Sequence, residues 1–148
     1  MDIAELLPED HVVVSLHVSD KAQLLQELAR RAAAVSNVSQ KQILAALEAR
    51  EKLGSTGLGE GFALPHASIE GLDRFVGLFA ALVRPIAYDA VDEKPVDLVF
   101  LLLIPTKVAA EYMTILAAIS RRMRDQDFTN RLRKSVDKAT LRELLAGG

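Results

Sequence analysis

The stretch VDLVFLLLIP, residues 96–105, is apolar at almost every position. A strand with one face in water alternates polar and apolar side chains, whereas this stretch presents apolar side chains on both faces. It is also far shorter than the roughly 20 apolar residues that a helix needs to cross a bilayer. We therefore expect a central strand over residues 96–104, covered by helices on both sides of a sheet.

The segments around this strand alternate between strand-like and helix-like patterns. β-branched and apolar runs indicate strands, while apolar residues at helical spacing after the capping residues Asp20 and Ser39 indicate helices. The segment 84–95 carries prolines and aspartates and is predicted to be a loop with a short extended piece. The alternation predicts an α/β fold. The other expected strands are 11–18 and 74–83, and the expected helices are 21–35, 40–53, 110–125, 128–133 and 141–145.

Composition narrows the class of protein. The 148 residues are 50% hydrophobic and 26% charged, as in a packed globular domain. The formal net charge is −2, and no basic run with interleaved aromatic residues occurs, so we expect no nucleic-acid partner. No signal-peptide pattern is visible, and the lack of cysteine excludes disulfides and thiol nucleophiles. We expect one domain over residues 1–148 in the cytoplasm, with no insertion into a membrane.

The glycine-rich segment GSTGLGEGFALPHA, residues 54–67, nearly fits three familiar motifs. A P-loop needs lysine where Glu60 stands, and a carboxylate there would repel a triphosphate. A dinucleotide-binding fingerprint needs glycine where Phe62 stands, after a strand rather than a helix. A nucleophile elbow around Ser55 needs glycine where Leu53 stands. None of the three motifs is present.

What remains is a loop rich in hydrogen-bond donors that leads to a histidine. Glycines let backbone N–H groups converge on an anion, and Ser55 and Thr56 add hydroxyl donors. Arg50 lies one helical turn before the loop, and its planar guanidinium suits phosphate oxygens. Pro65 restrains the backbone just before His66. These features indicate a phosphate carried on His66, while the alternative is a glycine turn beside an ordinary structural histidine.

The histidines give little reason to expect a metal. The chain has three, His11, His17 and His66. The first two lie at even spacing on the predicted strand 11–18, so we expect them to share a face at the surface or at the sheet edge. A zinc site would then need carboxylates brought from distant parts of the chain. We expect no metal and no cofactor.

Two blocks together carry a family resemblance. REKLGSTGLGEGFALPHA, residues 50–67, and PIAYDAVDEKPVDLVFLLLIP, residues 85–105, resemble enzyme IIA of the bacterial phosphoenolpyruvate-dependent phosphotransferase system, fructose/mannitol type (EIIA type 2). Within that family the sequence is most similar to the nitrogen-regulatory branch, and the likeness extends over nearly the whole chain. The resemblance implies a single-domain α/β fold with a mixed, mostly parallel five-stranded sheet, helices on both of its faces, and the histidine near strand ends.

The resemblance also implies roles for particular residues. His66 matches the phosphorylated histidine, attacking through Nε2, and Arg50 matches the arginine that pairs with the phosphate. Ser55, Thr56 and Gly57 match the loop beside the site. Family members receive phosphate from a small histidine phosphocarrier (HPr-like), which an enzyme I-type kinase charges from phosphoenolpyruvate. The implied protein is a component of a phosphotransferase relay rather than a free-standing enzyme.

One position departs from the family pattern. Many members carry a second histidine at the position that aligns with Tyr112, and tyrosine can donate a hydrogen bond there but cannot act as a base near neutral pH. We infer that this position tunes the site and is not essential for accepting phosphate.

Three functions are open on this basis. The favoured one is a regulatory phosphocarrier that controls targets such as transporters or sensor kinases, and through them nitrogen-linked metabolism. The alternative is a sugar-specific IIA component that passes phosphate to a separate IIB component and a membrane permease. A third interpretation is a binding module that passes no phosphate.

Overall fold

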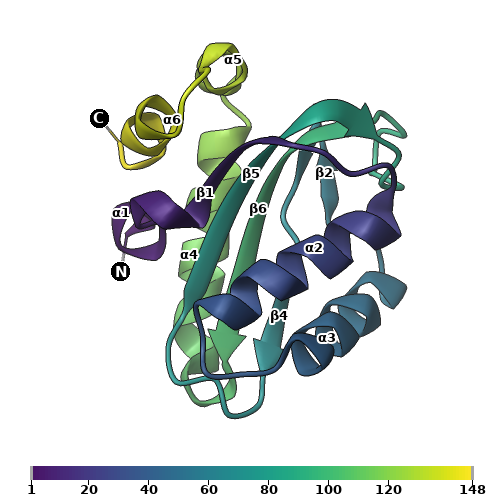
Figure 1. The fold of residues 1–148 in the computed structure, drawn as a ribbon, viewed down its shortest axis with the longest axis vertical. Helices are drawn as coiled ribbons and strands as arrows, with labels where there is room; N and C mark the ends of the chain where they lie inside the picture. The colour runs from purple at the N-terminus through teal and green to yellow at the C-terminus, as the bar shows by residue number, and fades with distance from the viewer. Residues whose placement is uncertain (1, 148) are drawn as a thin grey trace.

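The computed structural model describes residues 2–147, which form a mixed sheet between two layers of helices (Figure 1). The sheet has six strands in the order β1-β5-β6-β3-β2, with β4 also paired to β6. β1 pairs in parallel with β5, and β3 and β4 pair in parallel with β6. β2–β3 and β5–β6 are antiparallel. The strands are β1 Val12–Leu16, β2 Gly57–Gly59, β3 Phe62–Ala63, β4 His66–Ile69, β5 Val76–Ile86 and β6 Val96–Pro105.

β3 and β4 share one position in the sheet, because they pair with successive parts of β6. Phe62 lies opposite Leu98, and His66 lies opposite Leu102. Between the two strands, Pro65 has no N–H to donate, but its carbonyl accepts a hydrogen bond from the Leu102 N–H at 3.0 Å. The expected mixed, mostly parallel sheet is confirmed. It has five strand positions, one of which is divided between β3 and β4.

The central position of β6 is confirmed. Its side chains alternate between two apolar clusters, with Val99, Leu101 and Leu103 on one face and Phe100 and Leu102 on the other. Figure 1 shows α2 and α3 in front of the sheet and α4 behind it. The described helices are α1 Ile3–Leu6, α2 Lys21–Ala34, α3 Gln40–Lys52, α4 Ala109–Met123, α5 Gln126–Lys134 and α6 Lys138–Leu145.

The predicted helix caps are also found. The Asp20 side chain accepts a hydrogen bond from the Gln23 N–H at 2.8 Å, and Ser39 accepts one from the Gln42 N–H at 3.1 Å. α3 ends at Lys52, and Gly54 follows with φ of +148°, a conformation that favours glycine. This ending delivers the chain directly into the glycine-rich segment.

The first strand is shorter than predicted. Instead of residues 11–18 it spans Val12–Leu16, because His11 closes a short 3₁₀ helix and Ser15 has a positive φ of 54° that disturbs the pairing with β5. The expectation that His11 and His17 share a strand face is therefore wrong. The strand predicted over 74–83 instead runs from Val76 to Ile86, which takes in part of the predicted loop.

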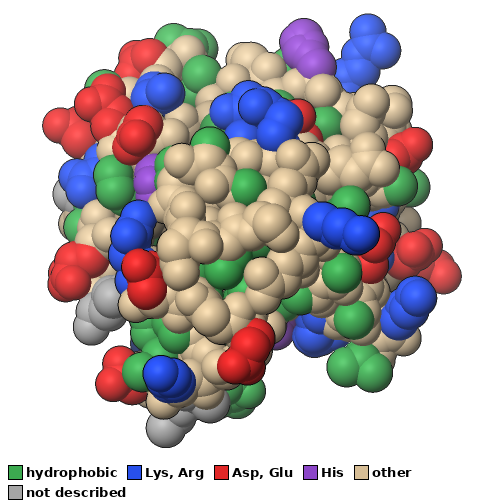
Figure 2. All heavy atoms as spheres, turned by 60° about the horizontal axis from the view of Figure 1, so that its bottom comes forward, with side chains coloured by type: hydrophobic (Ala, Val, Ile, Leu, Met, Phe, Trp, Pro, Cys, Tyr) green, Lys and Arg blue, Asp and Glu red, His purple; other side chains and the backbone are tan. Residues whose placement is uncertain are grey.

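Two features bear on the class of protein. In the part of the chain that the structure describes, no helix has the length and apolar character to cross a membrane. Acidic and basic side chains are interspersed on the face shown in Figure 2, in keeping with the small net charge. The domain boundaries at residues 1 and 148 stay a prediction.

Candidate functional site

His66, Arg50 and Tyr112 line one surface cavity of about 350 Å³. Each comes from a different element: His66 opens β4, Arg50 lies in the last turn of α3, and Tyr112 lies near the start of α4. All three side chains are half-buried. The cavity is completed by Ala46, Ala49, Leu53, Ala67, Ser68 and Ile104. The fold thus brings together residues that are up to 62 positions apart in the sequence, from 50 to 112.

The backbone fixes which nitrogen of His66 carries the proton. Nδ1 of His66 lies 2.8 Å from the carbonyl oxygen of Leu64. A carbonyl oxygen can only accept, so Nδ1 of the neutral ring is the donor and Nε2 keeps its free lone pair. The acceptor that selects this tautomer is thus a backbone carbonyl two residues before the histidine.

The surroundings of His66 favour its neutral form. Burial lowers the pKa of the imidazole from its ordinary value of 6.5, and the positive charge of Arg50 lowers it further. The Leu64 carbonyl and the Glu51 carboxylate act in the opposite direction, but the net shift of the pKa is downward. At neutral pH the ring is therefore uncharged and Nε2 is a nucleophile.

Arg50 is held at the end of its own helix. Its Nη1 donates a hydrogen bond to the carbonyl oxygen of Gly54 at 2.8 Å. A guanidinium has five N–H donors in a rigid fork, so this bond leaves others to meet an anion in the cavity. The arrangement places a positive charge beside the neutral imidazole.

The loop residues Ser55, Thr56 and Gly57 lie outside the cavity lining and bind to the protein itself. The Ser55 hydroxyl donates to the Tyr88 carbonyl at 2.9 Å, and the Gly57 N–H donates to Ser55 Oγ at 3.0 Å. Gly57 is also tightly packed, since a Cβ there would lie 2.8 Å from Ala90. That these loop residues contact a phosphoryl group stays a prediction.

A buried polar network that the sequence did not reveal lies behind the loop. Glu51 accepts hydrogen bonds from the backbone N–H of Thr56 at 3.1 Å and from the Thr56 hydroxyl, and forms an ion pair with Lys21 at 2.9 Å. The Tyr88 hydroxyl lies 3.0 Å from the Thr56 hydroxyl and 3.3 Å from Glu51. The Lys21 ammonium also sits 4.4 Å from the centre of the Tyr88 ring.

The pKa shifts in this network fix its protonation state. Burial alone would raise the pKa of Glu51, but hydrogen bonds from Thr56 and Lys21 outweigh burial and lower it. Burial and the Glu51 carboxylate raise the pKa of Tyr88. Glu51 is thus an ionised acceptor at neutral pH and Tyr88 a protonated donor.

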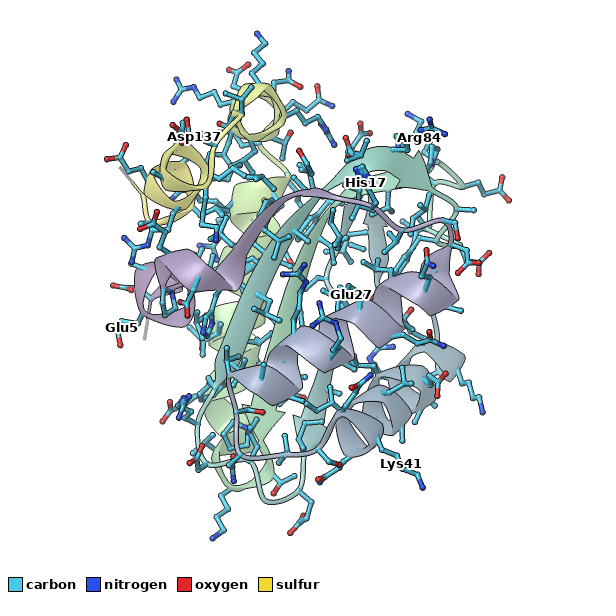
Figure 3. All side chains as sticks on the ribbon, in the orientation of Figure 1. Glu5, His17, Glu27, Lys41, Arg84 and Asp137 are labelled. Carbon is cyan, nitrogen blue, oxygen red and sulfur yellow. The ribbon has the colours of Figure 1, made fainter. Side chains whose placement is uncertain are left out.

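The other histidines lie apart from this site. His11 Nδ1 lies 2.8 Å from the Gly77 carbonyl oxygen. His17 lines a separate surface cavity with Arg84 and lies beside it at the upper end of the sheet in Figure 3. Among residues 2–147 no group of three or more metal-ligating side chains comes together.

Comparison with known proteins identifies the family of this chain. Residues 5–147 match the family described as "Phosphoenolpyruvate-dependent sugar phosphotransferase system, EIIA 2". The chain belongs to this EIIA type 2 family. The resemblance read from the two sequence blocks is therefore confirmed.

Two relatives of this EIIA chain are named as nitrogen regulatory proteins. A nitrogen regulatory protein of Bradyrhizobium diazoefficiens is 42% identical over 146 residues, which cover 99% of this chain and 95% of that protein. The crystal structure of the nitrogen regulatory protein IIA-Ntr from Neisseria meningitidis has a TM-score of 0.93 and 34% identity, and the match covers 97% of this chain and 98% of that one.

A sugar-specific relative is more distant. Enzyme IIA for mannitol from Escherichia coli, solved in complex with phosphorylated enzyme IIB, has a TM-score of 0.82 but only 18% identity, with 96% of this chain and 98% of that chain covered. At that identity the likeness shows the fold alone. The nitrogen regulatory relative at 42% identity supports a regulatory phosphocarrier. The family match supports phosphotransfer proteins as partners in general.

Proposed function

We propose that this protein accepts a phosphoryl group on Nε2 of His66 from a small HPr-like phosphocarrier. One observation carries the proposal: Nδ1 of His66 donates to the Leu64 carbonyl, which leaves Nε2 unprotonated on a ring that lines a cavity with Arg50. The phosphorylation state then decides which target proteins bind, such as transporters or sensor kinases. The proposed reaction places the protein in the cytoplasm, where phosphoenolpyruvate and its phosphocarriers are found.

The transfer step balances without any other reactant. The Nε2 lone pair of His66 forms a bond to phosphorus while the P–N bond to the donor histidine breaks, and the donor nitrogen keeps that electron pair. The His66 ring gains positive charge as the bond forms, and the Leu64 carbonyl stabilises it through the Nδ1–H. Phosphoryl transfer passes through a loose transition state, so the protein contributes mainly position and charge.

Arg50 stabilises the transferred group in this proposal. Its free N–H donors meet the phosphoryl oxygens, whose charge is spread over three atoms in the transition state. Ser55, Thr56 and Gly57 form the adjoining loop. A direct contact from either hydroxyl requires it to leave its present acceptor, the Tyr88 carbonyl for Ser55 and the Glu51 carboxylate for Thr56.

Tyr112 supplies a further donor in the lining of the cavity. A tyrosine hydroxyl donates one hydrogen bond, to a phosphoryl oxygen or to the neighbouring imidazole, but does not take up a proton at neutral pH. Tyr112 therefore adjusts the stability of the phosphorylated form in this proposal and is not needed for transfer itself.

Phosphorylation changes the charge of the surface around the cavity. A phosphorylated side chain adds roughly −1.5 to −2 charge units, which nearly doubles the formal −2 of the chain. A partner that docks over the cavity meets either a neutral imidazole or a dianion beside Arg50. Repulsion or a new arginine pair then selects between partners.

The test is reconstitution with phosphoenolpyruvate, enzyme I and the HPr-like phosphocarrier, followed by mass spectrometry of the intact protein. We expect one phosphoryl adduct in the wild type and in His17→Ala, the matched control at the far end of the sheet, and none in His66→Ala. An adduct that persists in His66→Ala, or no adduct in the wild type, overturns the proposal.

A second arm of the same experiment separates the regulatory function from sugar transport. Purified sugar-specific IIB component is added to the phosphorylated protein, and loss of the adduct is followed over time. We expect IIB to remove the phosphoryl group much more slowly than the HPr-like protein exchanges it. Rapid discharge by IIB supports the sugar-specific alternative instead.

A further inference from the structure

The Glu51 side chain is buried although it carries a charge, with 8% of its surface exposed. Among residues 2–147, the hydrogen-bond and ion-pair partners of its two oxygens all donate to it: the N–H and hydroxyl of Thr56, the Lys21 ammonium and the Tyr88 hydroxyl. Burying an ionised carboxylate is costly unless it is paired and hydrogen-bonded. Such a network fixes the positions of the residues that it binds. Here it fixes Thr56, which is connected to His66 by further hydrogen bonds.

Hydrogen bonds connect Glu51 to the His66 ring in successive steps. Glu51 holds both the N–H and the hydroxyl of Thr56. The Thr56 carbonyl accepts from the Leu64 N–H at 2.9 Å. The Leu64 carbonyl then accepts from His66 Nδ1 at 2.8 Å. The peptide group that sets the protonated nitrogen of His66 is thus anchored, through Thr56, to a buried carboxylate.

Arg50 is adjacent to Glu51 in the sequence. It immediately precedes Glu51 in the last turn of α3, so the position of the guanidinium and the position of the Leu64 carbonyl depend on one helix end. Lys21 lies in the first turn of α2, the neighbouring helix, and forms an ion pair with Glu51. This ion pair holds the C-terminal end of α3 against α2.

We propose that Glu51 is a positioning residue for phosphoryl transfer: it holds Thr56 and through it the Leu64 carbonyl, so that His66 keeps its proton on Nδ1 and presents Nε2 to phosphorus. The inference rests on the proposed function of His66. Glu51 does not touch the reacting atoms. When the Leu64 carbonyl moves out of hydrogen-bonding distance, the proton is free to occupy Nε2, and that form of the ring cannot attack through Nε2.

Glu51→Gln is the informative variant because it keeps the shape of the side chain. The Lys21 ammonium and the Thr56 N–H can only donate, and the hydroxyls of Thr56 and Tyr88 must reverse direction to accept from the amide NH₂ group of glutamine. Glu51→Gln therefore loses the ion pair and rearranges the hydrogen bonds to Thr56. Glu48→Gln, an exposed acidic residue one turn earlier on α3, is the matched control. Leu132→Ala controls for loss of stability alone, since this buried residue lies in α5 in the cluster on the opposite face of the sheet.

The first readout is the ¹⁵N NMR spectrum of the His66 side chain in the unphosphorylated full chain. We expect the Nδ1–H form in the wild type, in Glu48→Gln and in Leu132→Ala, and a mixture with the Nε2–H form in Glu51→Gln. This measurement uses no phosphate donor, so its result is independent of whether the proposed function holds. An unchanged Nδ1–H population in folded Glu51→Gln overturns the inference.

The second readout is the rate of phosphoryl acceptance from the phosphorylated HPr-like protein. In Glu51→Gln we expect kcat to fall roughly tenfold to a hundredfold with little change in KM, because the reacting group is misplaced while the docking surface is intact. A wild-type kcat, or an equal fall in Leu132→Ala, contradicts a positioning role.

If Glu51→Gln does not fold, two variants of Thr56 test the same inference. Thr56→Ser retains the hydroxyl that donates to Glu51, and Thr56→Val removes it at nearly constant shape. In the ¹⁵N NMR readout we expect Thr56→Ser to keep the Nδ1–H form of His66 and Thr56→Val to shift toward the Nε2–H form. Identical behaviour of Thr56→Ser and Thr56→Val contradicts the inference.

Discussion

The Nη1 group of Arg50 donates a hydrogen bond to the carbonyl oxygen of Gly54, 2.8 Å away and four residues further along the chain. The bond closes the end of α3 and holds the guanidinium in the wall of the cavity that His66 lines. A positive charge held in this way needs little rearrangement to meet an incoming phosphoryl group.

Replacing Arg50 tests its part in transfer. We expect Arg50→Ala to lower kcat for phosphoryl acceptance by roughly a hundredfold or more, the usual loss when a preorganised donor to a developing negative charge is removed. The kcat of Arg50→Lys should lie between those of the wild type and Arg50→Ala, because lysine keeps the charge but not the planar fork. Lys52→Ala, an exposed cation in the same turn, is the control. A wild-type rate in Arg50→Ala removes Arg50 from the mechanism.

The pH dependence of acceptance follows from the lowered pKa of His66. Because burial and Arg50 lower that pKa below 6.5, the neutral ring is the main form at and above neutral pH, and the rate should be flat there. The rate should fall only at acidic pH, as Nε2 takes up a proton. An NMR titration of the His66 ring checks this directly, and Arg50→Ala should move the midpoint upward. A wild-type midpoint above 6.5 contradicts the account.

The same pKa shift makes a contribution to stability with a defined sign. The folded protein binds a proton at His66 less readily than the unfolded chain does, so between the lowered pKa and the unfolded value near 6.5 the free energy of unfolding rises with pH. The contribution is complete above 6.5 and is lost as the pH falls through the folded pKa. His66→Gln should flatten this part of the stability profile in urea unfolding.

Breaking the buried ion pair tests the network behind the loop. Lys21→Met leaves the Glu51 carboxylate buried without its counter-ion, and we expect the free energy of unfolding to fall by about 1–3 kcal/mol, less than for a fully buried pair because Lys21 is partly exposed. Lys41→Met, which removes an exposed lysine that extends into solvent from α3, should have little effect (Figure 3). Equal stability of the two variants in urea unfolding argues against the network.

Tyr112 is expected to adjust the phosphorylated state rather than to form it. Tyr112→Phe removes one hydroxyl donor, which is worth about 0.5–1.5 kcal/mol, so the lifetime of phosphorylated His66 should change by roughly two- to tenfold. Phosphoryl acceptance should still occur. The lifetime is measured as the decay of the phosphoryl adduct, and complete loss of acceptance in folded Tyr112→Phe would show that the residue is essential.

The sequence predicted the central strand and the first two long helices because their patterns are long and regular. The two apolar faces of residues 96–104 identified the central strand, and Asp20 and Ser39 marked the beginnings of α2 and α3 correctly. β2, β3 and β4 have only three, two and four residues, too few for a periodic pattern. This part was therefore predicted to be a loop, although β3 and β4 pair with β6 and β2 pairs with β3.

The residues proposed for the site were predictable from the sequence, but the buried network beside them was not. Arg50 and His66 were proposed from the first block that resembles the family, and Tyr112 from its alignment with a second histidine of the family. The fold brings these three side chains around one cavity. Glu51 and Tyr88 were not proposed, because a glutamate near a helix end and a tyrosine in a polar segment ordinarily lie in water. Only the fold shows that both are buried around Thr56.

The most direct test is to locate the phosphoryl group in the phosphorylated wild-type protein by ³¹P and ¹⁵N NMR. Our account predicts a single phosphoramidate with phosphorus bonded to Nε2 of His66 and the proton retained on Nδ1. A phosphoryl group on Nδ1 of His66, or on any other residue, would contradict it.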